Sequence, residues 1–305
     1  MSILYSLNQV TAQDAVHLVI KRLMQYKLAH KLIDLSPKRV PQGKLAGSYI
    51  SKMKGRGMEF DEARHYQPGD DIRAIDWRVT ARTGKTHTKI FREERERPVF
   101  IVTDVSATMQ FGSQLQLKSV LAGHIASALA WSAKARGDRV GGLVFNSSAH
   151  REIKPKGQDR SILHLLSSIC HLQHSQPLQI QAQLNPLEEA CKRIRRLAKP
   201  GSLVCIISDF HHLNDTVLQY LRSITKHCEI RVYAISDPLE RNQSHLSSRQ
   251  PIWVTDGTEQ ALRTIKPNSS EQMTDNIKTQ LATLGIHQQW FCAGQSLISQ
   301  LSGKR

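Results

Sequence analysis

Oxygen-bearing side chains stand at every second position in the stretch DVSAT, near the end of the segment VFIVTDVSATM. Asp104, Ser106 and Thr108 come directly after an apolar run, and Asp209 ends a second such run, SLVCIISD. Carboxylate and hydroxyl oxygens, with room left for water, suit Mg²⁺ and are also accepted by Mn²⁺. If the two segments meet in the fold, the sequence predicts a divalent-cation site formed by Asp104, Ser106, Thr108 and Asp209.

A purely structural role for the two carboxylates is the alternative that the residues leave open. Asp104 and Asp209 could cap the helices that follow, because carboxylates at helix N-termini are common and favourable. His211 and His212 come next in the chain, but neighbouring loop residues point apart and no Cys or Glu stands at ligand spacing. We therefore expect these histidines to be a surface pair and not metal ligands.

Enzymatic chemistry at these segments has less support. Ser106 stands where a phosphatase loop of the DxDxT type carries its general acid, and serine cannot donate that proton. As a hydrolase nucleophile, Ser106 lacks a GxSxG turn and an assignable histidine base. Gly84-Lys85-Thr86 lacks the earlier glycine of a phosphate-binding loop, because Val79 stands there. The sequence favours a protein that is not an enzyme, with a metal-dependent phosphohydrolase as a less favoured alternative.

Strands and helices alternate from residue 98 onward. The apolar strands VFIVTD, RVGGLVF, SLVCIISD and EIRVYAIS are separated by helical stretches, and HQQWFC ends the pattern. This alternation predicts an α/β fold with a doubly wound, mostly parallel sheet, in which ligands bind beyond the carboxyl ends of the strands. The other expected elements are helices 115–136, 159–172, 186–198, 213–226 and 271–284, an edge strand at 149–153 and a hairpin around 253–260.

The region before residue 98 lacks the alternation of apolar strands and helical stretches that follows it. The predicted domains are therefore 1–97 and 98–305. Thr11 and Asp14 begin a predicted helix that ends before Pro37. A small glycine-containing, β-rich region follows the helix. The predicted apolar face of the helix consists of Val16, Val19, Ile20, Leu23, Leu28 and Leu32.

The β-rich region carries the charged block PGDDIRAIDW. Its carboxylates and arginines stand close enough in sequence for paired networks, so we expect a structural salt-bridge clamp, with a recognition surface as the alternative. Trp77 is expected to dock on the following domain. The residues expected to pair are Asp70, Asp71 and Asp76 with Arg73, Arg78 and Arg82.

Composition narrows the class of protein. The chain has 305 residues, 40% of them hydrophobic, and five scattered cysteines without a CxxC pair, so we expect a folded protein of the reducing cytoplasm. No stretch approaches the roughly 18 to 20 apolar residues that span a bilayer. The net charge of +16 is compatible with nucleic acid, an anionic membrane or an acidic protein as partner. We expect the basic run at 192–199 to be a solvated helix face, and nucleic-acid binding is the second hypothesis.

Residues 104–108 resemble the DxSxS signature of the metal-ion-dependent adhesion site in von Willebrand factor type A domains, with Thr108 replacing the last serine. Asp209 matches the second acidic position of that family. The family also uses a threonine from a loop between the two, for which this chain offers only Ser161. The resemblance implies a type A-like fold for 98–305 and a Mg²⁺ or Mn²⁺ ion whose open position takes a partner's Asp or Glu.

The segment EFDEARHYQPGDDIRAIDWRVTAR, followed by FREERERPVFIVTDVSATMQFG, resembles the bacterial domain of unknown function 58 family. In that family such a block precedes a type A-like domain, and the resemblance covers about residues 43–240. Members are typically encoded near MoxR-type AAA+ ATPases and other type A-domain proteins. The resemblance therefore implies a bacterial, non-enzymatic, cation-assisted protein-binding adaptor that is accessory to a MoxR-type ATPase.

Overall fold

The computed structural model describes residues 12–36, 58–93, 96–175, 185–241, 252–255, 260–263 and 269–302. The chain divides into two compact units, one made by Met1–Arg39 and Arg97–Arg305 and the other by Val40–Glu96. This division differs from the predicted grouping of 1–97 against 98–305, because the N-terminal helices pack with the α/β unit. The second unit is therefore an insertion between two segments of the α/β unit.

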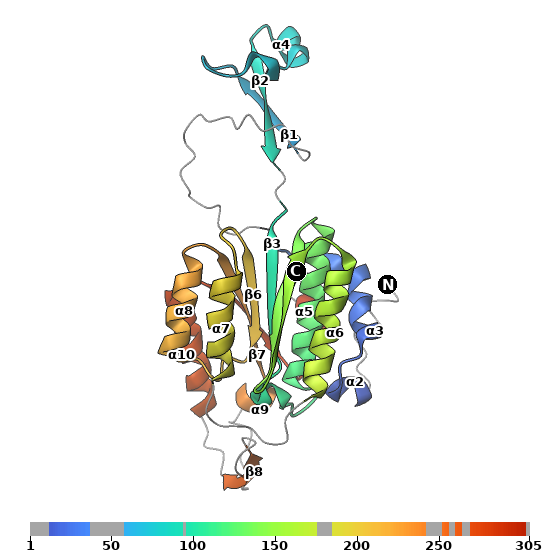
Figure 1. The fold of residues 1–305 in the computed structure, drawn as a ribbon, viewed down its shortest axis with the longest axis vertical. Coiled ribbons are helices and arrows are strands. Elements are labelled where there is room, and N and C mark those ends of the chain that lie inside the picture. Colours follow the sequence, from blue (N-terminus) through green and yellow to red (C-terminus); the bar gives the residue numbers. More distant parts are fainter. Residues whose placement is uncertain are drawn as a thin grey trace. The chain divides into compact units, whose positions relative to one another are not determined.

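A six-stranded sheet forms the centre of the α/β unit (Figure 1). Its strands are β3 (Pro98–Asp104), β4 (Arg139–Phe145), β5 (His150–Lys156), β6 (Leu203–Ser208), β7 (Glu229–Ser236) and β10 (His287–Cys292). They are ordered β10-β7-β6-β3-β4-β5, and every neighbouring pair is parallel except the edge pair β4–β5. The predicted α/β class with a mostly parallel sheet is confirmed. The order of this doubly wound sheet changes direction between β3 and β6.

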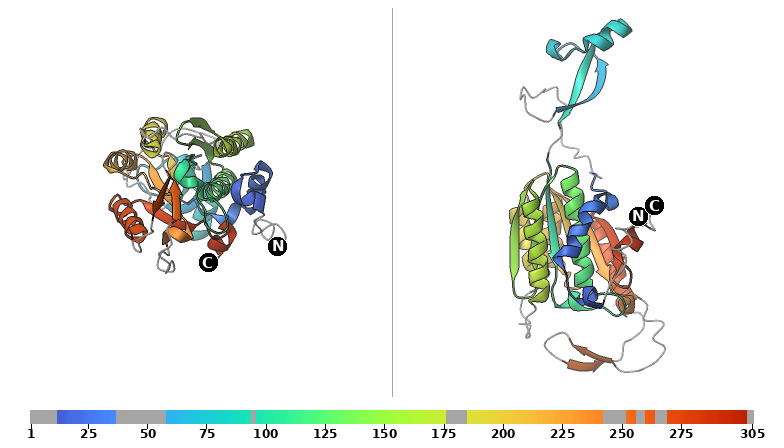
Figure 2. Two further views of the ribbon diagram at one scale, coloured as in Figure 1. Left: turned by 90° about the horizontal axis from the view of Figure 1, so that it is seen from below. Right: turned by 90° about the vertical axis from the view of Figure 1, so that its right-hand side faces the viewer.

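Helices cover both faces of the sheet, as Figures 1 and 2 show. One face packs against α5 (Lys118–Ala135), α6 (Asp159–His174) and α11 (Leu297–Ser302). The other packs against α7 (Pro186–Leu197), α8 (Asp215–Thr225) and α10 (Ser269–Thr283). The central strands are continuous apolar runs because both of their faces are covered.

The remaining predicted elements of this unit are also present. The helices expected from the sequence lie within three residues of their predicted bounds, and the edge strand is β5. The expected hairpin is formed by β8 (Ile252–Thr255) and β9 (Gln260–Arg263), which pair antiparallel. Among the described residues, no helix combines the length and apolar character that crossing a membrane requires.

The N-terminal segment differs from the predicted single helix. It consists of α2 (Ala12–Val16), α3 (Ile20–Met24) and the 3-10 helix η1 (Gln25–Leu32), because Val19 is extended, with φ −111° and ψ 121°. This break changes which side chains face inward: Leu18 and Leu23 are buried, whereas Leu28 is 68% exposed. The predicted apolar face is therefore wrong for Val16, Val19, Ile20 and Leu28, which are exposed. The predicted N-cap, Thr11, lies outside the described residues.

Helix α5 provides the docking surface for this segment. A Cβ atom on Gly123 would lie 2.6 Å from Leu18 Cδ1, so the glycine makes room for the leucine. Ser127 Oγ donates a 2.6 Å hydrogen bond to the carbonyl of Leu23, and Ser132 Oγ donates one of 2.6 Å to that of His30. Because the sheet lies on its other side, α5 is buried almost all round.

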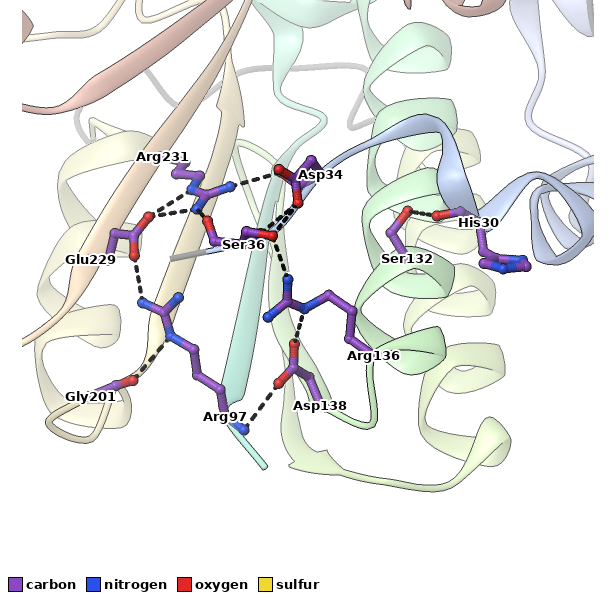
Figure 3. A network of polar contacts seen from close by, with 10 residues as sticks. All are labelled: His30, Asp34, Ser36, Arg97, Ser132, Arg136, Asp138, Gly201, Glu229 and Arg231. Atoms are coloured by element: carbon purple, nitrogen blue, oxygen red, sulfur yellow. Dashed lines mark hydrogen bonds and ion pairs between the residues drawn. The ribbon is translucent and has the colours of Figure 1, made fainter. Parts of the chain in front are cut away.

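A buried arginine, Arg231, anchors the end of the N-terminal segment at the amino edge of the sheet (Figure 3). Arg231 of β7 donates to the carbonyl of Asp34 at 3.0 Å and to that of Ser36, and it pairs with Glu229 at 2.8 Å. Arg97, which precedes β3, donates to the other oxygen of Glu229 at 2.9 Å. One network therefore joins described residues that precede the insertion in the chain, Asp34 and Ser36, to Arg97, which follows it.

The inserted unit is built on an antiparallel hairpin of β1 (Met58–His65) and β2 (His87–Glu93). The chain between them forms η2 (Ile72–Ala74) and α4 (Trp77–Thr83). Carboxylates of the charged block begin both helices: Asp71 accepts from the Arg73 amide, and Asp76 accepts from the amides of Arg78 and Val79.

The predicted pairing inside the charged block is not what these residues do. Asp70 pairs with Arg64 at 2.7 Å, outside the block, and the other two carboxylates serve as caps. Among the described residues, no ion pair joins Asp70, Asp71 or Asp76 to Arg73, Arg78 or Arg82. Trp77 is 67% exposed. The expected docking of Trp77 on the other domain stays a prediction, with the recognition surface as its alternative.

Candidate functional site

The first predicted ligand, Asp104, is the last residue of β3 and is buried. Its Oδ1 accepts a 2.9 Å hydrogen bond from the Ser106 amide, and its Oδ2 accepts one of 2.6 Å from Ser208 Oγ. Ser208 ends β6, the parallel neighbour of β3. Asp104 is therefore held at the point where the strand order changes direction, which is where ligands bind in doubly wound sheets.

The second predicted carboxylate, Asp209, is positioned by a turn immediately after β6. Phe210 adopts a positive φ of 57°, which a side chain of its size tolerates only when its surroundings hold it. Its ring is fully buried in the core, and its amide donates to Ser208 Oγ at 3.1 Å. The His211 amide then donates to Asp209 Oδ1 at 3.0 Å. The anchored phenylalanine thus fixes the direction of the Asp209 carboxylate.

The two carboxylates influence each other's ionisation. Burial raises the pKa of Asp104 to about 6, and repulsion from the Asp209 carboxylate adds to the rise. Burial would raise the pKa of Asp209 as well, but attraction to Lys118 and hydrogen bonds from Lys118 and the His211 amide together outweigh burial and hold that pKa below its usual value. A positive charge close to both carboxylates would relieve the repulsion.

The two hydroxyl-bearing residues supply enclosed oxygens that lack well-formed hydrogen bonds. Ser106 is fully buried, and Thr108 lies on the 3-10 helix η3 (Ala107–Gln110) of the same loop. Ser106 Oγ and Thr108 Oγ1 are both enclosed, and neither forms a hydrogen bond of good geometry with the described residues. The Ser106 hydroxyl nevertheless lies close enough to Asp104 to help lower the pKa of that carboxyl. Buried hydroxyls without a well-formed hydrogen bond are rare in folded proteins and indicate a missing partner. This donor set fits a hard divalent cation.

The site differs from a metal centre made of acidic, histidine and cysteine ligands alone. Within the part of the chain that the structure describes, no three such side chains are grouped so that they could hold a metal ion. His211 is exposed and His212 is partly exposed, and their rings pack edge to face. Any cation here would depend on the Ser106 and Thr108 hydroxyls and on water, as expected for Mg²⁺.

The structure adds a residue that the sequence analysis missed. Lys118, the first residue of α5, places its Nζ atom 2.9 Å from Asp209 Oδ2 and 2.6 Å from Glu240 Oε1. Its side chain is only 3% exposed. Burial alone would lower the pKa of Lys118, but the two carboxylates outweigh burial and raise it, so the amine is charged. A sequence signal exists, since a lysine is unfavourable in the first turn of a helix.

A third strand end contributes carboxylates to the same edge. Asp237 follows β7, and Glu240 lies on α9 (Pro238–Arg241). Asp237 accepts hydrogen bonds from the amide of Ser113 at 2.8 Å and from its hydroxyl, which ties the loop before α5 to α9. Glu240 Oε2 accepts from the Asp237 amide at 2.8 Å. The sequence signal was the ending AISD, which repeats the ending of SLVCIISD.

Ser161, the substitute considered for the family's threonine, lies elsewhere. Its Oγ donates a 2.9 Å hydrogen bond to the carbonyl of Val140, near the start of β4, whereas Asp104 lies beside the end of that strand. The antiparallel strand β5 carries the chain back to the amino edge before α6 begins, which explains the displacement. The hydroxyl beside the Asp104 loop is that of Ser147, which accepts from the Ala107 amide at 3.4 Å.

Comparison with known proteins identifies relatives but no activity. Residues 62–283 match the family model described as a protein of unknown function, DUF58. Uncharacterized proteins of Mycobacterium tuberculosis and Mycobacterium bovis are 30% identical over 210 residues, which is 69% of this chain and 65% of theirs. The match thus covers slightly less than two thirds of the length of these relatives.

Solved structures give weaker matches. The conserved hypothetical protein BatB from Bacteroides thetaiotaomicron is 16% identical, with a TM-score of 0.43, over 68% of this chain and 94% of that protein. A mutant of the PilB minor pilin from Streptococcus sanguinis is 10% identical, with a TM-score of 0.39, over 73% of this chain and 65% of that protein.

Proposed function

This chain belongs to the DUF58 family of proteins of unknown function, and we propose that it is a non-enzymatic adaptor that binds another protein with the help of a divalent cation. The observation that carries the proposal is the pair of enclosed hydroxyls, Ser106 Oγ and Thr108 Oγ1, on the loop that follows the buried Asp104 carboxylate; neither forms a hydrogen bond of good geometry with the described residues. A buried polar atom without a partner destabilises a fold by about 1–3 kcal/mol, so a ligand that uses both oxygens would offset that cost.

The chemistry of these residues suits Mg²⁺ or Mn²⁺. Ser106 and Thr108 would offer hydroxyl oxygens, and Asp104 and Asp209 would offer carboxylates directly or through water. When bound, the ion supplies an open coordination position for an Asp or Glu of the partner. Because Ser208 and the His211 amide hold the two carboxylates in place, the partner's carboxylate would have to reach one fixed point. That requirement would give the interaction its specificity.

A catalytic role for Ser106 has no support from its surroundings. Its Oγ atom makes no hydrogen bond of good geometry to a base in the described part of the chain, whereas a serine nucleophile needs one. The arrangement of the sheet is compatible with a von Willebrand factor type A-like domain, which supports a binding role. From the family resemblance we propose a MoxR-type AAA+ ATPase, or another type A-domain protein, as the partner.

Calorimetric titration with Mn²⁺ tests the metal site. We expect the wild type to bind one ion weakly, and Ser106→Ala combined with Thr108→Val to weaken that binding about tenfold or more, because the hydroxyl ligands are gone. Ser202→Ala is a matched control, since its buried Oγ also lacks a partner but precedes β6 at the opposite edge of the sheet. Equal affinity in the wild type and the double variant would contradict the metal site.

The partner is tested separately. A MoxR-type ATPase encoded beside this chain should be recovered in a pull-down with wild type in Mg²⁺, and recovery should fall with EDTA or with Asp104→Ala combined with Asp209→Ala. Thermal melts should first confirm that the variant is folded. Equal recovery in all samples would contradict the metal-mediated mechanism, and no recovery with wild type would remove the proposed partner.

A further inference from the structure

The strand-end site is closed by an internal ion pair. The Lys118 ammonium lies between Asp209 Oδ2, at 2.9 Å, and Glu240 Oε1, at 2.6 Å. Lys118 and Asp209 are almost inaccessible, whereas the Glu240 side chain is 34% exposed. The buried carboxylates of the site are therefore separated from solvent, and the Lys118–Glu240 pair reaches the surface.

The position of Lys118 is not explained by the helix that it begins. A positive charge in the first turn of α5 opposes the helix dipole, so the helix itself would favour an acidic residue there. The lysine is held instead by carboxylates from two other strand ends, one after β6 and one on α9. The Lys118 ammonium is therefore held by carboxylates of the strand-end site and not by its position in α5.

Lys118 supplies what the site otherwise lacks, which is a positive charge beside Asp209. An ammonium and a divalent cation repel each other, and both would use the same carboxylate. Lysine carries its charge on a flexible four-carbon stem, so it can leave a carboxylate without movement of the backbone. Glu240 bears the kind of group, a carboxylate, that the proposed partner would bring.

We infer that Lys118 is a built-in competitor of the divalent cation, and that it keeps the site closed through Asp209 and Glu240 until a cation displaces it. This inference rests on the proposed function, because it describes how that site is regulated. Closure of this kind makes cation binding weak in the isolated protein. It also links cation binding to release of α9, which carries Glu240 and is tied through Asp237 to Ser113.

Removing the lysine charge tests the inference. We would titrate Mn²⁺ by calorimetry into wild type, Lys118→Met and Lys118→Arg, with Lys27→Met as a matched loss of one charge from the exposed pair with Asp159. We expect Lys118→Met to bind Mn²⁺ about tenfold or more tightly than wild type, because a unit charge no longer opposes the ion. Lys118→Arg and Lys27→Met should bind no more tightly than wild type.

Stability gives a second readout that does not depend on a partner. Without metal, Lys118→Met should melt at a lower temperature than wild type, because Asp209 and Glu240 lose their counter-ion. Saturating Mn²⁺ should then raise its melting temperature by more than it raises that of wild type. If Lys118→Met does not fold, Lys118→Met combined with Glu240→Gln removes both charges and gives the same comparison.

The outcomes separate this inference from the proposed function. Measurable Mn²⁺ binding by wild type with equal or weaker binding by Lys118→Met would overturn the competitor role and leave the metal site standing. No binding by either protein at millimolar Mn²⁺ would overturn both. Tight binding that appears only in Lys118→Met would support the competitor role and show that the lysine takes the cation's place in the isolated chain.

Discussion

Ser208 Oγ donates a 2.6 Å hydrogen bond to Asp104 Oδ2 and so joins the ends of β6 and β3. These strands are parallel neighbours, and the order of the sheet reverses between them. The bond holds the Asp104 carboxylate at the point where it is repelled by Asp209. Holding a repelled carboxylate in a fixed position should lower the free energy of unfolding of the metal-free protein, and that loss of stability can be measured.

Replacing Asp104 with Asn should stabilise the metal-free protein. Burial and repulsion raise the pKa of Asp104 to about 6, so the carboxylate is ionised at pH 7.5 and its ionisation destabilises the folded state relative to the unfolded chain. Each pKa unit corresponds to about 1.4 kcal/mol, and we expect Asp104→Asn to add about 1–3 kcal/mol to the free energy of unfolding in EDTA. Thermal or urea unfolding measures the change. Asp275→Asn, at a position 65% exposed, is the control and should change stability little.

The same substitution should have the opposite effect when metal is present. Asp104→Asn removes a ligand charge, so millimolar Mn²⁺ should raise the melting temperature of the variant less than that of wild type. An Asp104→Asn protein that is less stable than wild type in EDTA would show that the carboxylate is a structural group, such as a helix cap.

The arginine network at the amino edge of the sheet should contribute strongly to stability. Arg231→Met leaves Glu229 with only Arg97 and removes the donors to the carbonyls of Asp34 and Ser36. We expect a loss of about 3–5 kcal/mol in urea unfolding, because the largely buried Glu229 carboxylate loses one of its two counter-ions and two backbone carbonyls lose their donors. Arg193→Met, which breaks an exposed pair with Glu152, should lose about 1 kcal/mol or less.

A second variant separates the two effects of Arg231. Arg231→Met combined with Glu229→Gln removes the charge of the Glu229 carboxylate, which has lost one of its two counter-ions in the single variant, so part of the lost stability should return. Equal losses of stability in the single and double variants would show that the loss comes from the missing hydrogen bonds to the carbonyls of Asp34 and Ser36. In that case hydrogen exchange should show faster opening of the N-terminal segment than of the sheet.

The sheet and the positions of Asp104 and Asp209 could be predicted because they depend on local patterns. Apolar runs such as SLVCIISD form strands that are buried on both faces, and an acidic residue at the end of such a run must lie at the carboxyl edge. Ser106 follows for the same reason, since its amide bonds to Asp104 two residues earlier.

Features set by contacts distant in sequence could not be predicted in this way. Lys118 meets Asp209 and Glu240 across 91 and 122 positions of the chain, so no local pattern records the cluster. The predicted apolar face of the N-terminal helix is partly wrong because the helix is interrupted at Val19. A single extended residue leaves no mark in the spacing of apolar residues. The position of Ser161, away from Asp104, could not be predicted because the direction of β5 depends on its pairing with β4.

Buried His124 should make the protein sensitive to acid. Burial, with a contribution from Arg22, lowers the pKa of His124 to about 4 from its usual 6.5, so the folded state holds it neutral. The unfolded chain binds a proton more readily in this range, so stability is complete above about pH 6.5 and is lost as pH falls toward 4. The loss from this residue should be about 1.4 kcal/mol per pH unit within that window.

His124→Leu tests this dependence. The Nδ1 atom has no hydrogen-bond partner among the described residues, so an apolar side chain should be tolerated at pH 7. The difference between variant and wild type in urea unfolding should grow in favour of the variant from pH 6.5 to pH 4.5. His164→Gln, at an exposed position of α6, is the control and should follow wild type. Parallel pH profiles for His124→Leu and wild type would contradict the prediction.

The basic helix face should bind nucleic acid only weakly, in spite of the net charge of +16. Its charges are partly compensated within the protein: Arg193 and Arg196 lie 3.3 Å and 3.8 Å from Glu152, and Lys192 lies 3.4 Å from Glu189. Fluorescence anisotropy with labelled DNA and RNA should therefore show no tight binding at about 0.15 M salt. The variant Arg193→Gln combined with Arg196→Gln should differ little from wild type. Tight, salt-sensitive binding that this variant weakens and Asp104→Ala does not would favour a nucleic-acid-binding protein over the adaptor.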